Sequence, residues 1–156
     1  MSLLKLTWQK SMGWILFIPF CGTLILIMKF WRRYRIENHD EIRRQYKIYA
    51  KDRSPLLICA NHLTYVDPPV IIWALAWHIW YVFHFRSLSW NLAATEYRKN
   101  PFFRAVLFFA KGIYINRQGG KNHYDQVLGV ARQLMLRGEP VTIFPEGRRS
   151  RTGRAA

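Results

Sequence analysis

The sequence predicts an α/β domain with a mostly parallel sheet flanked by helices. Short apolar runs alternate with helical segments after Ser54, which is the order of elements that such a fold requires. Each run is bounded by polar or turn-forming residues, and polar side chains collect directly after the runs. The chain has 156 residues, of which 51% are hydrophobic, and this is enough for roughly one domain with a packed core.

Residues 1–31 are expected to form a membrane segment. The run 11–28 carries no charge and approaches the about 20 apolar residues that a membrane-spanning helix needs. Pro19 and Gly22 lie in the middle of this run, so a helical hairpin that dips into one leaflet is an alternative to a helix that spans the membrane. A buried core helix is a further alternative.

A basic juxtamembrane helix is predicted over residues 32–53, where Arg43, Arg44 and Lys47 occur at helical spacing. Basic residues directly after the apolar run place that end of it in the cytoplasm by the positive-inside rule. We therefore expect the protein at the cell membrane, with the following domain facing the cytoplasm. The net charge of +15 favours anionic partners such as lipid headgroups and phosphate-bearing substrates. No recognised nucleic-acid-binding motif is visible, so nucleic acid is not an expected partner.

Residues 54–156 predict the α/β domain. The expected strands are four compact apolar runs, 56–60, 92–95, 113–116 and 141–144. The helices expected between them are 68–83, 101–109 and 122–137, with Gly138 as the C-cap of the last one. If the strands are parallel, their carboxyl ends meet at one edge, where open α/β sheets bind their ligands.

His62 and Asp67 follow the first expected strand and are candidate catalytic residues. A carboxylate bonded to one imidazole nitrogen fixes the tautomer and leaves the other nitrogen basic, as the deprotonation of an alcohol requires. The structural alternative is that His62 bridges the loop while Asp67 caps the helix that begins at Pro68.

Arg117 and Arg148 follow the third and fourth expected strands, and planar guanidinium groups are suited to holding phosphate. Gly112 and Gly147 would let the backbone come close to a ligand, or they make tight turns. Cys59 lies inside the first strand run, where a buried and inert thiol is expected. The cysteines show no metal-binding spacing, so no metal site is expected.

Three segments of the sequence resemble the motifs of one family, the glycerolipid acyltransferases, which includes the bacterial 1-acylglycerol-3-phosphate O-acyltransferases. The stretch from Asn61-His62 to Asp67 resembles the motif in which four residues separate the His from the Asp. The second and third motifs are similar to Gly112-Ile113-Tyr114-Ile115-Asn116-Arg117 and to Phe144-Pro145-Glu146-Gly147-Arg148-Arg149-Ser150. The three occur in the family's order, and the resemblance covers about residues 54–154.

The resemblance implies transfer of a fatty acyl group from acyl-coenzyme A or acyl-acyl carrier protein to the free hydroxyl of 1-acylglycerol-3-phosphate. The product would be phosphatidic acid, in phospholipid biosynthesis, and the reaction needs no cofactor or metal. His62, oriented by Asp67, would take the proton from the hydroxyl. The substrate-binding residues that the resemblance implies are Gly112, Asn116, Arg117, Glu146, Gly147 and Arg148.

Other interpretations remain open at this point. The acceptor is alternatively another glycerol phosphate or lysophospholipid, or the chain is a non-catalytic, membrane-bound module that binds anionic lipid. The family domain normally continues past the third motif into another strand and a fourth, proline-containing motif, whereas this sequence stops at Ala156. We therefore expect the C-terminal part of the domain to be missing.

Overall fold

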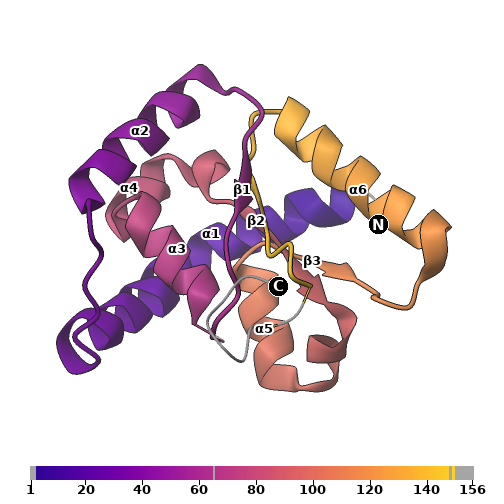
Figure 1. The fold of residues 1–156 in the computed structure, drawn as a ribbon, viewed down its shortest axis with the longest axis horizontal. Helices are drawn as coiled ribbons and strands as arrows, with labels where there is room; N and C mark the ends of the chain where they lie inside the picture. The colour runs from indigo at the N-terminus through magenta and orange to yellow at the C-terminus, as the bar shows by residue number, and fades with distance from the viewer. Residues whose placement is uncertain (1–2, 65, 148, 150–156) are drawn as a thin grey trace.

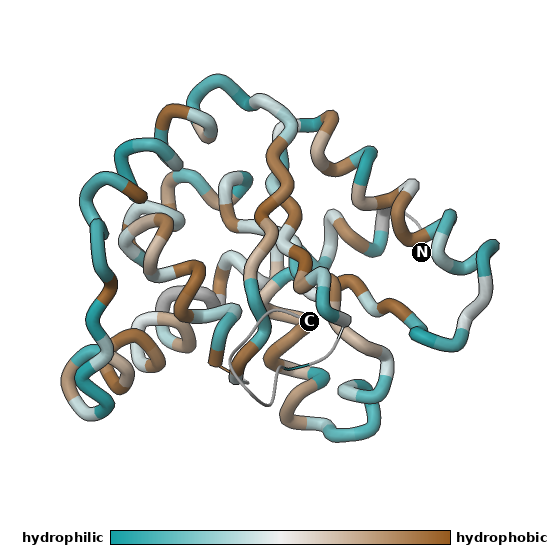
Figure 2. Tube along the Cα trace, in the orientation of Figure 1, coloured by the Kyte–Doolittle hydropathy of each residue, from teal (hydrophilic) through white to brown (hydrophobic). Residues whose placement is uncertain are grey.

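A computed structural model of the chain describes residues 3–64, 66–147 and 149 (Figure 1). The elements that precede the sheet are the helix α1 (Leu3–Leu26), the π-helical turn η1 (Ile27–Trp31) and the helix α2 (His39–Asp52). The expected basic helix thus begins later than residue 32. Its residues are mostly hydrophilic, as the colour of α2 in Figure 2 shows, whereas much of the strands in the centre has the hydrophobic colour.

The sheet has four strands, and every pair of neighbours is parallel. The strands are β1 (Leu57–Cys59), β2 (Trp90–Ala94), β3 (Gly112–Ile115) and β4 (Val141–Ile143), in the order β1-β4-β2-β3. The prediction of a parallel α/β sheet is confirmed. The carboxyl ends of all four strands therefore lie at one edge, and β4 is the strand next to β1.

Helices cover both faces of the sheet (Figure 1). On one face lies α6 (Gly120–Leu136), as expected, and Gly138 follows it with a φ of +72°, the left-handed conformation of a helix C-cap. The buried cluster that includes α6 consists of Leu6, Trp90, Ile113, Val127, Ala131, Leu134 and Val141. A second cluster, on the side of α1 to α4, consists of Cys21, Tyr46, Ile72, Ala76, Tyr81, Phe85 and Leu88.

The helix expected over residues 68–83 is wrong as a single element, because it is divided into α3 (Asp67–Leu75) and α4 (His78–Phe83). Ala76, between them, is fully buried and has an extended backbone. Side chains from elsewhere bind the carbonyls at the end of α3. The hydroxyl of Tyr81 donates to the Ile72 carbonyl at 3.2 Å, and Arg43 donates to the Trp73 carbonyl at 3.0 Å.

Cys59 is exposed, so the expectation of a buried thiol is wrong. The reason is the position of β1, which is an edge strand of the sheet. Leu57 and Cys59 lie on the same face of β1, since side chains alternate along a strand, and both are exposed. Cys21, on α1, is the buried cysteine.

The helix α1 bends near Pro19, where a proline ring interrupts the helical hydrogen bonds. The arms Lys5–Ile15 and Pro19–Trp31 meet at 57°. Within the described residues, no single helix is long and apolar enough to cross a membrane, whereas these two arms pass that test together by length and composition. A membrane segment over residues 1–31 stays a prediction.

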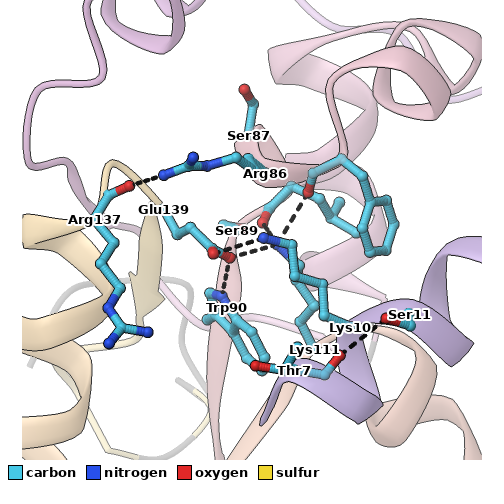
Figure 3. A network of polar contacts seen from close by, with 12 residues as sticks. Thr7, Lys10, Ser11, Arg86, Ser87, Ser89, Trp90, Lys111, Arg137 and Glu139 are labelled. Carbon is cyan, nitrogen blue, oxygen red and sulfur yellow. Dashed lines mark hydrogen bonds and ion pairs between the residues drawn. The ribbon is translucent and has the colours of Figure 1, made fainter. Parts of the chain in front are cut away.

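The first arm of α1 is attached to the domain by polar contacts. The Gln9 side chain donates to the carbonyls of Phe108 and Gly112 at 3.0 and 3.1 Å. Lys10 forms an ion pair of 2.6 Å with Glu139, which precedes β4. Glu139 also joins the fully buried Lys111, at 3.2 Å (Figure 3). These contacts lie at the amino edge of the sheet, opposite the edge that carries His62.

Candidate active site

The candidate site begins where β1 ends. His62 lies in the loop between β1 and α3, and Asp67 is the first residue of α3. The Nδ1 atom of His62 lies 2.9 Å from Oδ2 of Asp67, a hydrogen bond in which the ring N–H donates to the carboxylate. Both side chains are largely buried, with exposed fractions of 14% and 16%. The two predicted catalytic residues are therefore in contact.

Asp67 holds the whole loop as well as the imidazole. Its Oδ2 accepts hydrogen bonds from the backbone N–H groups of Leu63 and Thr64 at 2.6 and 2.8 Å. Its Oδ1 accepts from the Thr64 hydroxyl at 2.5 Å. Burial acts to raise the pKa of Asp67, but the bonds from Thr64, His62 and Leu63 outweigh it and lower this pKa. Asp67 is thus ionised at neutral pH and holds His62 in one tautomer.

The other face of the site comes from the loop after β4. The ring of Phe144 stacks on the His62 ring with 4.3 Å between centroids, and Glu146 accepts a hydrogen bond from the His62 backbone N–H at 3.3 Å. Gly147 closes this loop by donating to the Phe144 carbonyl at 3.0 Å. Its φ of +64° is a conformation that glycine adopts without strain. The predicted residues Glu146 and Gly147 are therefore beside His62.

The Nε2 atom of His62 makes no hydrogen bond with any residue that the structure describes. With Nδ1 protonated and bonded to Asp67, Nε2 carries the lone pair and is free to accept a proton. An imidazole oriented in this way is suited to act as a general base toward a hydroxyl group.

Arg117 and Asn116 lie after β3, at the other side of the sheet. Three strand spacings of about 4.8 Å, or roughly 14 Å, separate β3 from β1. The Asn116 side chain accepts from the Gln118 N–H at 3.0 Å, and its backbone N–H donates to His123 at 2.8 Å. Arg117 is exposed, and its guanidinium has no hydrogen bond or ion pair within the described part of the chain. These residues share the edge with His62 but are not in contact with it.

Gly112 lies at the amino end of β3 and is buried, away from the edge that carries His62. A Cβ atom there would lie 2.7 Å from the Leu107 carbonyl oxygen, so the residue allows close packing of the helix α5 (Pro101–Phe109) against β3. The structure gives Gly112 a packing role and does not bring it to the site. Arg148 lies outside the described residues.

Sequence reasoning missed Thr64 and Phe144 as parts of the site. Thr64 carried a weak signal, since a threonine three residues before an aspartate at a helix start often bonds to it. Phe144 stands at the start of the third motif, but no role was assigned to it, because a phenylalanine at the end of a buried strand is ordinarily a core residue. Its stacking on His62 depends on the pairing of β1 with β4, which the order of the strands in the sequence does not reveal.

The comparisons with known proteins bear on the whole domain. The family model described as Acyltransferase matches residues 33–156, which include the sheet and every residue of the site described above. No match was found among curated proteins or among solved structures. Since the family model covers well over half of the chain, the protein belongs to the acyltransferase family, that of the glycerolipid acyltransferases.

Proposed function

We propose that the chain transfers a fatty acyl group from acyl-coenzyme A or acyl-acyl carrier protein to the free hydroxyl of 1-acylglycerol-3-phosphate, giving phosphatidic acid. The observation that carries the proposal is the 2.9 Å contact of His62 with Asp67 at the carboxyl edge of the sheet. Membership of the acyltransferase family supports acyl transfer to a glycerolipid-type acceptor, and the choice of acceptor and donor is our proposal.

The chemistry is a direct displacement. Nε2 of His62 takes the proton of the acceptor hydroxyl while the oxygen of that hydroxyl attacks the carbonyl carbon of the thioester. The carbon–sulfur bond then breaks, and the thiolate that leaves takes up the proton from the imidazolium. The Asp67 carboxylate stabilises the imidazolium while it holds that proton.

Arg117 and Arg148 are proposed to hold the phosphate of the acceptor, with Asn116, Glu146 and Gly147 shaping the same edge of the site. A guanidinium group offers paired N–H donors to phosphate oxygens. The guanidinium of Arg117, which is exposed and has no partner among the described residues, supports this role. Glu146 is anionic and accepts a hydrogen bond from the His62 backbone N–H. We therefore propose that it holds the loop in position and does not contact the phosphate.

The N-terminal segment is proposed to bind the phospholipid of the cell membrane, with the catalytic domain facing the cytoplasm. The support is an exposed apolar surface beside basic residues. Phe30 and Trp31, in the turn η1, have exposed fractions of 67% and 79%. Lys29 and Arg32 to Arg35 lie in the same part of the sequence and would contact anionic headgroups. The bent shape of α1 favours a segment that dips into one leaflet.

An acceptor panel tests the proposed substrate. Membranes that contain the chain are given a labelled acyl thioester with 1-acylglycerol-3-phosphate, glycerol 3-phosphate or a lysophospholipid that bears a larger headgroup. We expect transfer to 1-acylglycerol-3-phosphate to be fastest. Faster transfer to another acceptor would assign that acceptor instead. If the folded protein transfers to none, the enzymatic proposal fails and a lipid-binding module is the better account.

A further inference from the structure

Two arginines and a tyrosine gather at the β3 side of the sheet, away from His62. Arg98 lies in the 3-10 turn η3 (Thr95–Lys99), which follows β2, and Arg104 lies in the first half of α5. Tyr114 is in β3. The guanidinium carbon of Arg98 lies 5.3 Å from the centroid of the Tyr114 ring. Both arginine side chains are exposed, and neither has an ion pair or hydrogen bond with a described residue.

The hydroxyl of Tyr114 is shielded from solvent and has no hydrogen-bond partner among the described residues. Buried polar groups in folded proteins are nearly always hydrogen-bonded, so such a group points to a missing partner. Burial raises the pKa of Tyr114, although both arginines are near enough to act in the opposite direction. The phenol is therefore protonated at neutral pH and carries a donor that has no acceptor among the described residues.

One member of this cluster lies beside an apolar surface. Arg104 borders an open depression of about 280 Å³, lined otherwise by Pro101, Ala105, Phe108 and Phe109 of α5. Ligand pockets usually measure about 300 to 1,000 Å³, so the depression suits one part of a ligand rather than the whole of it. The helix α5 begins near the carboxyl end of β2 and ends near the amino end of β3, so the depression lies along the helix between the two edges of the sheet.

We infer that Arg98, Arg104 and the Tyr114 hydroxyl form a subsite for a phosphate group of an amphiphilic substrate, whose apolar portion lies along α5. Two positive charges and one neutral donor complement a phosphate, and the apolar wall complements an attached hydrocarbon. The inference rests on the proposed function, because an acyltransferase of this kind handles phosphate on both substrates. The phosphate belongs either to the glycerolipid acceptor or to the coenzyme or carrier part of the donor.

Direct binding tests the subsite without any need for turnover. The full chain is titrated calorimetrically with glycerol 3-phosphate, for the acceptor, and with unacylated coenzyme A, for the donor. We compare the wild type with the double variant Arg98→Gln/Arg104→Gln and with Tyr114→Phe. The control is Lys99→Gln, which removes a neighbouring exposed charge. Thermal melting of each variant identifies any that does not fold.

The double variant is expected to bind at least one of the two ligands about tenfold more weakly, and Tyr114→Phe severalfold more weakly, while Lys99→Gln binds like the wild type. The ligand whose binding weakens identifies the source of the phosphate. Equal binding by all variants, an equal loss in Lys99→Gln, or no binding of either ligand by the wild type overturns the inference. The His62→Ala variant is expected to retain this binding. A wild-type protein that binds one of the ligands but transfers no acyl group would contradict the proposed function alone.

Discussion

The Asp67 carboxylate accepts four hydrogen bonds, and only one of them comes from His62. The other three come from the loop between the two residues. The geometry of the imidazole is therefore set by the local chain and does not require a distant element. The pair could be predicted from a short segment of sequence for that reason, once its position after a strand and the family resemblance were added to the spacing. The contacts from Phe144 and Glu146 depend on the pairing of β1 with β4, and no local pattern predicts them.

The Asp67→Asn variant tests whether the charge of the carboxylate is needed for catalysis, apart from the role of residue 67 in the fold of the loop. The amide has the same shape but no charge, so it cannot stabilise the imidazolium or enforce one tautomer. We expect kcat to fall by roughly a hundredfold or more, within the range that general-base catalysis contributes. Circular dichroism should show a folded protein. An unchanged kcat in a folded variant would mean that Asp67 serves only to hold the loop before α3.

At the scale of elements, the strands and the helices α5 and α6 agree with the sequence pattern because each has a clear apolar period and a turn residue at its end. The division between α3 and α4 was not predictable in the same way. The residues around Ala76 are apolar and suit a continuous helix. The break is stabilised by Tyr81 and Arg43, which bind the last carbonyls of α3. Only the tertiary structure brings these partners together.

Gly112 provides a test of the contact between α5 and β3. In Gly112→Ala the new methyl group meets the Leu107 carbonyl oxygen at 2.7 Å, so the free energy of unfolding should fall by about 1–3 kcal/mol. Gly129→Ala is the matched control, since a methyl group there has no atom within 4 Å and α6 gains a better helix former. That change should raise the free energy of unfolding by about 0.5–1 kcal/mol. Urea denaturation measures both, and equal effects would exclude a special role for Gly112.

The turn η1 provides a test of membrane binding. The double variant Phe30→Ser/Trp31→Ser removes two exposed aromatic side chains without opening the core. Burial of each such side chain contributes roughly 1.5–3 kcal/mol, so binding to vesicles with anionic lipid should weaken by at least tenfold. Leu136→Ser, at an exposed position on α6, is the control and should bind normally. Vesicle co-sedimentation measures the binding of the wild type and of both variants. Equal binding by these three proteins would reject the N-terminal segment as the membrane contact.

At the scale of the whole molecule, the two edges of the sheet have different functions. The carboxyl edge carries His62 and the exposed arginines, whereas the amino edge carries a buried polar cluster of Lys10, Lys111 and Glu139 (Figure 3). Lys111 also donates to the carbonyls of Phe85 and Leu88, at 3.0 and 2.7 Å. Through Lys10 and Gln9, the cluster attaches α1 to the sheet. The sequence alone did not predict this, because a lysine before a strand ordinarily lies in solvent.

The buried Lys111 predicts how stability depends on pH. Burial lowers its pKa from 10.5 to about 7, although Glu139 acts in the opposite direction. Between these two values the unfolded chain binds a proton that the folded chain has released. The contribution of Lys111 to the free energy of unfolding therefore rises as pH increases from 7 to 10.5. Urea titrations give the free energy of unfolding of the wild type and of Lys111→Met. The difference between the two free energies should change between pH 7 and pH 10.5. If the difference in the free energy of unfolding stays constant, Lys111 does not release a proton when the chain folds at these pH values.

The central claim is that His62 is the general base of acyl transfer, and single-turnover kinetics test it most directly. Transfer of a labelled acyl group to 1-acylglycerol-3-phosphate is followed with the wild type, with His62→Ala, and with His84→Ala, which changes an exposed histidine on the side of α4. We predict a loss of at least a hundredfold for His62→Ala and a rate close to wild type for His84→Ala. Transfer by folded His62→Ala at the wild-type rate would contradict the account.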